Sequence, residues 1–220
     1  MIESKRKRNT HHIKKENIIL NHINNNYREY IIISIIFLIG LIIGVIFINN
    51  LKENQQETIK LYINNFIESI NNGSEINKTE LLKESIISNI KIFLLLNIAG
   101  LTVVGMPILY IIVCFRGFCL GYTLSAIIGA LGIKNGVFFI VSTIILQNVI
   151  LIPSMFALAV SGIKLYKSVI KDKRRENIKI EILRHTLFSL IILIFMIVAS
   201  FIEVYISTNF FINIFNFINT

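Results

Sequence analysis

The sequence predicts an all-α integral membrane protein, a bundle of about five transmembrane helices with the N-terminus inside and the C-terminus outside. Of its 220 residues, 54% are hydrophobic and only 16% are charged, whereas an ordinary soluble domain carries about 25% charged residues. Several apolar runs reach the length of about 18 residues that is needed to cross a bilayer. The basic residues, which give a net charge of +9, gather in two blocks beside apolar runs. This is the positive-inside pattern, and we expect no nucleic-acid partner.

The first elements are a basic cytoplasmic segment, 1–29, and a transmembrane span at 30–48. The span is too long for the core of a signal peptide, and no small-residue cleavage site follows it, so we expect an uncleaved helix. An outer loop, 49–89, carries more glutamate than lysine, and a helix is expected to begin in it near Asn77. Five apolar residues of this loop fall on one face of an earlier helix: Ile59, Ile63, Phe66, Ile67 and Ile70. This amphipathic face suits either the membrane surface or a partner protein.

The remaining spans complete a single membrane domain, 30–206, with no soluble domain. We expect them at 90–115, 117–133, 135–162 and 187–206, with a basic inner loop at 164–185 and an apolar C-terminal tail at 207–220. Arg116 and Gly117 form the one polar, flexible point between two long uncharged runs. The pattern therefore predicts a cytoplasmic turn there, with Arg116 reaching lipid phosphates. The alternative is a charge held in a cavity among the helix ends.

Glycines spaced one helical turn apart indicate close helix packing. Gly40 and Gly44 form one such pair, and Gly117 and Gly121 form another. Pairs of this kind let two helix backbones approach closely in a membrane. They predict a tightly packed bundle or a homo-oligomer.

Polar residues inside the expected spans are the candidate functional residues. Glu203 is the one carboxylate within a span, near its outer end, and we expect it to pair with Lys91 or Lys134. Ion or proton coupling is the alternative role of this carboxylate. Gln147 and Asn148, followed by Pro153, favour hydrogen bonds between helices. They also suit the site of a transporter with a broken helix.

The sequence offers no constellation for catalysis. It contains no phosphate-binding loop, zinc-protease motif or nucleophile elbow. The four histidines, His11, His12, His22 and His185, are placed by the pattern in basic cytoplasmic segments. Cys114 and Cys119 fit no metal or redox spacing. We therefore expect a protein that is not an enzyme and needs no cofactor or metal.

Three stretches in this order carry a resemblance to a known family: RGFCLGYT at 116–123, LQNVILIP at 146–153 and ASFIEVYIS at 199–207. Together with the layout of spans, they resemble the stage II sporulation protein M family of endospore-forming bacteria. Arg116, Gly117 and Glu203 match this family pattern. A histidine and a glutamate that wider relatives carry near 147–152 are absent, which counts against proton-coupled transport.

The resemblance implies a multi-pass protein of the mother-cell membrane that acts in engulfment. In that family the protein anchors two peptidoglycan-cleaving partners, the stage II sporulation proteins D and P, at the sporulation septum. Membrane lipids would be its other partners. The alternative function is a permease-like or channel component that moves a small solute or ion through the bundle.

Overall fold

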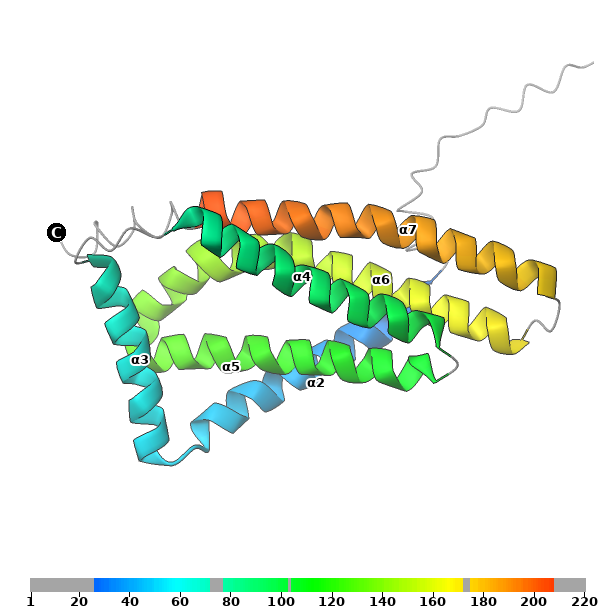
Figure 1. Ribbon diagram of the computed structural model, residues 1–220. Coiled ribbons are helices and arrows are strands. Elements are labelled where there is room, and N and C mark those ends of the chain that lie inside the picture. Colours follow the sequence, from blue (N-terminus) through cyan, green and yellow to red (C-terminus); the bar gives the residue numbers. More distant parts are fainter. Residues whose placement is uncertain (1–25, 72–76, 103, 172–174, 208–220) are drawn as a thin grey trace, which may run out of the picture.

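The computed structural model describes residues 26–71, 77–102, 104–171 and 175–207, and this part of the chain folds into helices without strands (Figure 1). The elements are α2 (Tyr27–Asn49), α3 (Glu53–Asn71), α4 (Lys78–Leu101), α5 (Gly105–Ile140), η1 (Val141–Ile145), α6 (Leu146–Lys171), α7 (Arg175–Phe201) and η2 (Ile202–Ser207). Four helical stretches are long and apolar enough to cross a membrane: Tyr27–Asn49, Lys78–Leu101, Gly105–Val169 and Ile178–Ile206. The predicted all-α membrane fold is thus confirmed. The number of crossings and their orientation stay predictions, and most of the basic segment 1–29 and of the tail 207–220 lies outside the described residues.

The third of these stretches folds back on itself at Gly132. This residue has φ 78° and ψ 168° inside α5, a conformation that glycine adopts without the clash of a Cβ atom. A Cβ atom on Gly136 would lie 2.9 Å from Cα of Ile128, although eight residues of straight helix span about 12 Å. Figure 1 shows α5 running away from α4 and the chain then returning as α6. The expected boundary between spans at 133 and 135 falls beside this reversal.

The chain turns between the end of α4 at Leu101 and the start of α5 at Gly105, and the turn predicted at Arg116 and Gly117 is wrong, because α5 continues through both residues. Thr102 closes the end of α4 by donating its hydroxyl proton to the carbonyl of Ala99 at 2.9 Å, and the amide of Gly105 donates to the carbonyl of Thr102 at 3.0 Å. Pro107 then occupies the first turn of α5, where its missing N–H costs no helical hydrogen bond. Because no charged residue marks this turn, the apolar pattern concealed it.

Helices α2 and α5 pack through the two glycine pairs. A Cβ atom on Gly40 or Gly44 would meet the backbone carbonyls of Cys114 or Phe118, respectively. In return, a Cβ atom on Gly117 or Gly121 would meet the backbone of Phe37 or Leu41. From Gly40 to Gly44 the contacted residue moves forward from Cys114 to Phe118, so α2 and α5 run in the same direction. The predicted close packing is therefore found, and it joins two helices of one chain.

Helix α3 lies across one end of the bundle and contacts α5 there (Figure 1). We call this end, which we expect outside the cell, the outer end and the opposite end the inner end. Ile67 is 7% exposed, and Ile59 and Ile63 are half-buried. These side chains, with Phe66, line a groove of about 560 Å³ against Ile127 and other residues of α5. The apolar face predicted for α3 thus packs on the bundle as far as the structure describes it.

Helix α4 begins where the sequence predicts. The Asn77 side chain accepts a hydrogen bond of 3.2 Å from the amide of Glu80. This is an N-cap, which satisfies one of the helix amides that have no partner within the helix. From this point α4 runs between α6 and α7, where Leu96, Leu158 and Met196 are 0% exposed. The core of the protein lies among α4, α6 and α7, and it continues to Ile33 of α2 and to Leu109 and Val113 of α5.

Candidate functional site: two polar clusters in the bundle

Helices α4 and α7 are antiparallel and carry a ladder of polar side chains between them. Near the outer end, the Asn89 side chain donates to Ser200 Oγ at 2.8 Å and to the Met196 carbonyl at 3.3 Å. Toward the inner end, Asn97 donates to Ser189 Oγ at 3.2 Å. Such bonds hold apolar helices together in a membrane, where a polar group has few alternative partners. The ladder therefore fixes the register of α4 against α7.

The outer polar cluster consists of Ser85, Asn89, Gln147, Ser200 and Glu203. Glu203 is its central acceptor, because one carboxylate oxygen receives hydrogen bonds from Ser85 Oγ and, at 2.6 Å, from Gln147 Nε2. Its donors come from α4 and α6, and Glu203 itself lies in η2, so this carboxylate ties three segments together. Hydrogen bonds to a charged acceptor are stronger than neutral ones. The cluster is thus the main polar tie at the outer end of the bundle.

Two π-helical turns meet at this cluster. η1 ends two residues before Gln147, and η2 contains Glu203. The two turns contact each other. π-Helical turns in α-helices are rare and are frequent at functional sites, because the wider turn re-aims the side chains beside it. Here they occur in both segments that bring Gln147 and Glu203 within hydrogen-bonding distance.

The inner polar cluster consists of Asn97, Ser161, His185 and Ser189. His185 is 2% exposed, and its Nδ1 atom lies 2.9 Å from Ser161 Oγ. Its Nε2 atom is buried and has no hydrogen-bond partner among the described residues. A Cβ atom on Gly100 would lie 3.2 Å from this Nε2 atom, so the small size of Gly100 makes room for the ring. His185 therefore lies buried inside the bundle at its inner end, its position on the cytoplasmic side stays a prediction, and His11, His12 and His22 lie outside the described residues.

The far ends of the two clusters are about a membrane apart, whereas their near ends, Asn97 and Asn89, are eight residues or about 12 Å apart on α4 and are separated by an apolar layer. His185 and Glu203 are 18 residues apart on one face, or about 27 Å of helix, close to the roughly 30 Å of a bilayer core. Between them lie Leu96 and Met196, both 0% exposed, and Phe93 and Ile192, both about 5% exposed. This close-packed layer leaves no polar side chain of the ladder between Ser189 and Ser200. The geometry therefore suits helix packing at both membrane boundaries better than conduction.

Arg116 lies inside the bundle and not at its surface. It is about 17 Å along α5 from Gly105, and its Nε atom is buried without a hydrogen-bond acceptor among the described residues. Its guanidinium group interacts electrostatically with Glu203 and Cys119. The expectation that Arg116 and Glu203 lie at opposite membrane faces is thus wrong, and the alternative of a charge held among helices fits better.

The other candidate residues take different places. Lys91 and Lys134, the expected partners of Glu203, are exposed, and the hydrogen bonds described above come from Ser85 and Gln147 instead. Asn148 donates to the carbonyl of Ile144 in its own helix at 2.8 Å. Pro153 lies inside α6 and faces an apolar trough away from both clusters. The structure therefore brings Gln147 and Glu203 together and leaves Asn148 and Pro153 apart from them.

Sequence reasoning missed Ser85, Asn89, Ser161 and His185. A signal was present, because polar residues recur on one helical face in otherwise apolar segments. On α7 these residues are His185, Ser189, Ser200 and Glu203, and on α4 they are Ser85, Asn89 and Asn97. Each helix alone shows only isolated polar residues, and their meaning depends on the pairing of α4 with α7.

The fold and these clusters define a polytopic α-helical membrane protein. Residues 33–208 match the family described as stage II sporulation protein M, and the chain belongs to this family. It is also 30% identical, over 182 residues, to an uncharacterized protein of Methanocaldococcus jannaschii, across 80% of this chain and 92% of that protein. No solved structure gives a significant match. The resemblance seen in the sequence is thereby confirmed at the level of the family.

Proposed function

We propose that this protein is a membrane scaffold for sporulation engulfment, which anchors peptidoglycan-degrading partners at the septum so that septal wall thinning and membrane migration proceed. Family membership supports a sporulation-related role in a membrane. The partners we propose are the stage II sporulation proteins D and P, as the family resemblance implies. The observation that carries the scaffold role is the position of α3, a helix packed across the outer end of the bundle.

The part of α3 that we propose for partner binding is its exposed aromatic and apolar surface beside the groove against α5. Tyr62 is 75% exposed, and Leu61 and Phe66 are 55% and 52% exposed. Exposed aromatic side chains are enriched at protein interfaces because they bury a large area at a low cost in conformational entropy. Tyr62 and Phe66 also line the groove against α5, together with the more buried Ile63 and Ile67. The partner face proposed here therefore consists of the exposed parts of Leu61, Tyr62 and Phe66, while Ile63 and Ile67 fix α3 in place.

The rest of the bundle supplies a rigid platform for α3. The outer polar cluster ties α4, α6 and η2 together directly beside the outer end. The glycine contacts between α2 and α5 fix the helix that precedes α3 in the chain. A scaffold gains from such rigidity, because a preorganised surface loses less entropy when it binds.

The alternative function, a permease or channel, is supported by the charged and amide groups of the outer polar cluster. The apolar layer between the two clusters, formed by Leu96, Ile192 and Met196, argues against a transport path through the bundle. Flux of protons or monovalent cations in reconstituted vesicles, lost in Glu203→Gln, would favour transport over the scaffold. We expect no such flux.

The first test is a clean deletion in the source organism, followed by membrane-dye microscopy during sporulation. We expect cells that stall with flat or bulging septa. Normal engulfment in the deletion strain would contradict the proposed process.

The second test separates the scaffold role from the process. Tyr62→Ala with Phe66→Ala should reduce co-purification with proteins D and P and fail to restore engulfment. Asn64→Ala with Asn65→Ala, two exposed polar positions of the same helix, should behave as wild type. If the aromatic variant retains both partners at wild-type protein level, α3 is not the docking surface.

A further inference from the structure

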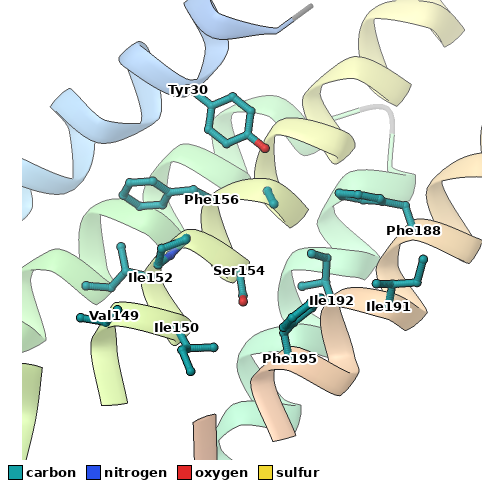
Figure 2. Close-up of a pocket in the computed structure, with 12 residues that line it drawn as sticks. Tyr30, Val149, Ile150, Ile152, Ser154, Phe156, Phe188, Ile191, Ile192 and Phe195 are labelled. Carbon is teal, nitrogen blue, oxygen red and sulfur yellow. The ribbon is translucent and has the colours of Figure 1, made fainter. Parts of the chain in front are cut away.

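An apolar trough of about 500 Å³ opens between α2, α6 and α7 (Figure 2). Six of its lining residues define it here as the α2–α6–α7 trough: Tyr30, Pro153, Phe156, Ala157, Phe188 and Phe195. Figure 2 shows Phe156 and Phe188 on its two sides and Tyr30 at one end, with the hydroxyl oxygen pointing toward the gap. The trough begins near the inner end of the bundle and extends toward mid-membrane. Because the lining of the trough is apolar, the group that fills it in a bilayer must be apolar as well.

The shape of the trough favours a flexible chain over a second helix. Helices that pack in membranes use small residues so that their backbones can approach. The α2–α6–α7 trough is instead bordered by four aromatic rings and branched side chains, with Ser154 and Ala157 as its small residues. The glycine pairs suited to helix packing are already occupied between α2 and α5. An acyl chain can follow such an uneven surface, because each of its bonds rotates.

Basic side chains lie near the inner end of the trough, where the headgroup of a lipid with its acyl chain in the trough would lie. Arg184 is one turn before Phe188 on the same face of α7, and Lys164 is two turns after Ala157 on the same face of α6. Arg184 is exposed and pairs with Glu181 at 2.9 Å, while Lys164 is half-buried. On α2, Arg28 is exposed beside Tyr27. Basic residues between helix ends on the cytoplasmic side attract anionic lipid headgroups.

We propose that the α2–α6–α7 trough is a binding site for one anionic phospholipid of the cytoplasmic leaflet. An acyl chain lies between Phe156 and Phe188 and against Ala157, and the phosphate lies near Lys164 and Arg184. The Lys167–Glu29 ion pair, at 2.6 Å, joins α6 to α2 at the same end of the bundle. A lipid bound there would bridge α6 and α7 below the inner polar cluster. The site does not depend on the scaffold role, because it uses other residues.

The test measures binding of phosphatidylglycerol to the full-length protein in detergent, with phosphatidylcholine as the neutral lipid, by native mass spectrometry and by the shift in melting temperature. We expect phosphatidylglycerol to bind more tightly and to raise the melting temperature more. Lys164→Gln with Arg184→Gln should weaken its binding roughly thirtyfold, at about tenfold for each 1.4 kcal/mol and about 1 kcal/mol for each cation. Lys91→Gln with Lys179→Gln removes the same charge from exposed positions elsewhere and should leave binding unchanged.

The trough itself is tested by filling it. Ala157→Phe should reduce binding of both lipids, whereas Ile194→Phe, at a 62% exposed position of α7 outside the trough, should not. Equal binding of the two lipids, or equal losses in the charge variant and its control, would overturn the proposal. So would a change of oligomeric state or the loss of a bound protein in Ala157→Phe, because the trough would then be a protein interface.

Discussion

Replacing Gly117 by alanine tests the packing of α2 against α5. The added Cβ atom would fall on the carbonyl oxygen of Phe37, a backbone atom that no rotamer change can move. The two helices would have to separate by on the order of 1 Å, which forfeits a quarter to a half of the dispersion attraction across the contact. Overpacking of this kind costs about 1–3 kcal/mol. Alanine recovers about 0.5–1 kcal/mol as the better helix former, so we expect a net loss of about 1–2 kcal/mol.

The same helix offers a matched control. The Cβ atom of alanine at Gly129 would find only Lys60 Cε, at 3.9 Å. Gly129→Ala should therefore gain only from the higher helix propensity of alanine. Its free energy of unfolding should equal or exceed that of the wild type. Reversible unfolding of the purified protein in mixed micelles, followed by circular dichroism, gives the two free energies of unfolding under one condition.

A double variant sharpens the test. Gly44→Ala should cost about as much as Gly117→Ala, because its Cβ atom would meet the backbone of Phe118. The double variant should lose less stability than the sum of the two single losses, since one separation of the helices relieves both contacts. The reasoning is refuted if Gly117→Ala is as stable as Gly129→Ala, or if the two losses add fully.

Further variants probe the turn and the outer polar cluster by the same unfolding measurement. Gly132→Ala should cost about 1–3 kcal/mol through its backbone conformation alone, since no atom of the described residues lies within 4 Å of the added Cβ; an unchanged stability would contradict the tight reversal. Glu203→Leu should cost about 1–3 kcal/mol by leaving the Gln147 amide without its acceptor, and Glu203→Gln should cost less. Asn89→Leu should cost about 0.6–1.7 kcal/mol, the range for hydrogen bonds between helices in a membrane, and Ser200→Ala in that background should add little.

The elements that could be predicted are those whose signal is local. The apolar run of α2 and the start of α4 near Asn77 each depend on neighbouring residues, and both were predicted correctly. The reversal near residue 133 was predicted because the hydrophobic run is interrupted by Gly132 and Lys134. In each case the residues that decide the structure lie within about one helical turn of it.

The misplaced turn shows where local signals fail. Arg116 is the most polar residue between two apolar runs, and polarity normally marks a membrane boundary. In the structure it lies inside α5, because Thr102 and Gly105 form the turn earlier and Gly117 packs against α2. A charge inside a bundle is tolerated when neighbouring helices supply partners, and that information lies on other helices. The outer polar cluster was missed for the same reason, since its members come from α4, α6, α7 and η2.

The positions of the two clusters give the bundle two different ends. At the outer end, the carboxylate of Glu203 joins three segments beside α3, the helix that we propose as the docking surface. At the inner end, His185 and Ser161 hold α6 to α7 beside the cations that we propose for lipid binding. A pull on α3 from wall-bound partners would be transmitted through α5, which contacts both α2 and α3. If the protein acts as the proposed scaffold, the close glycine contacts of α5 determine how much load the α2–α5 pair can carry before it separates.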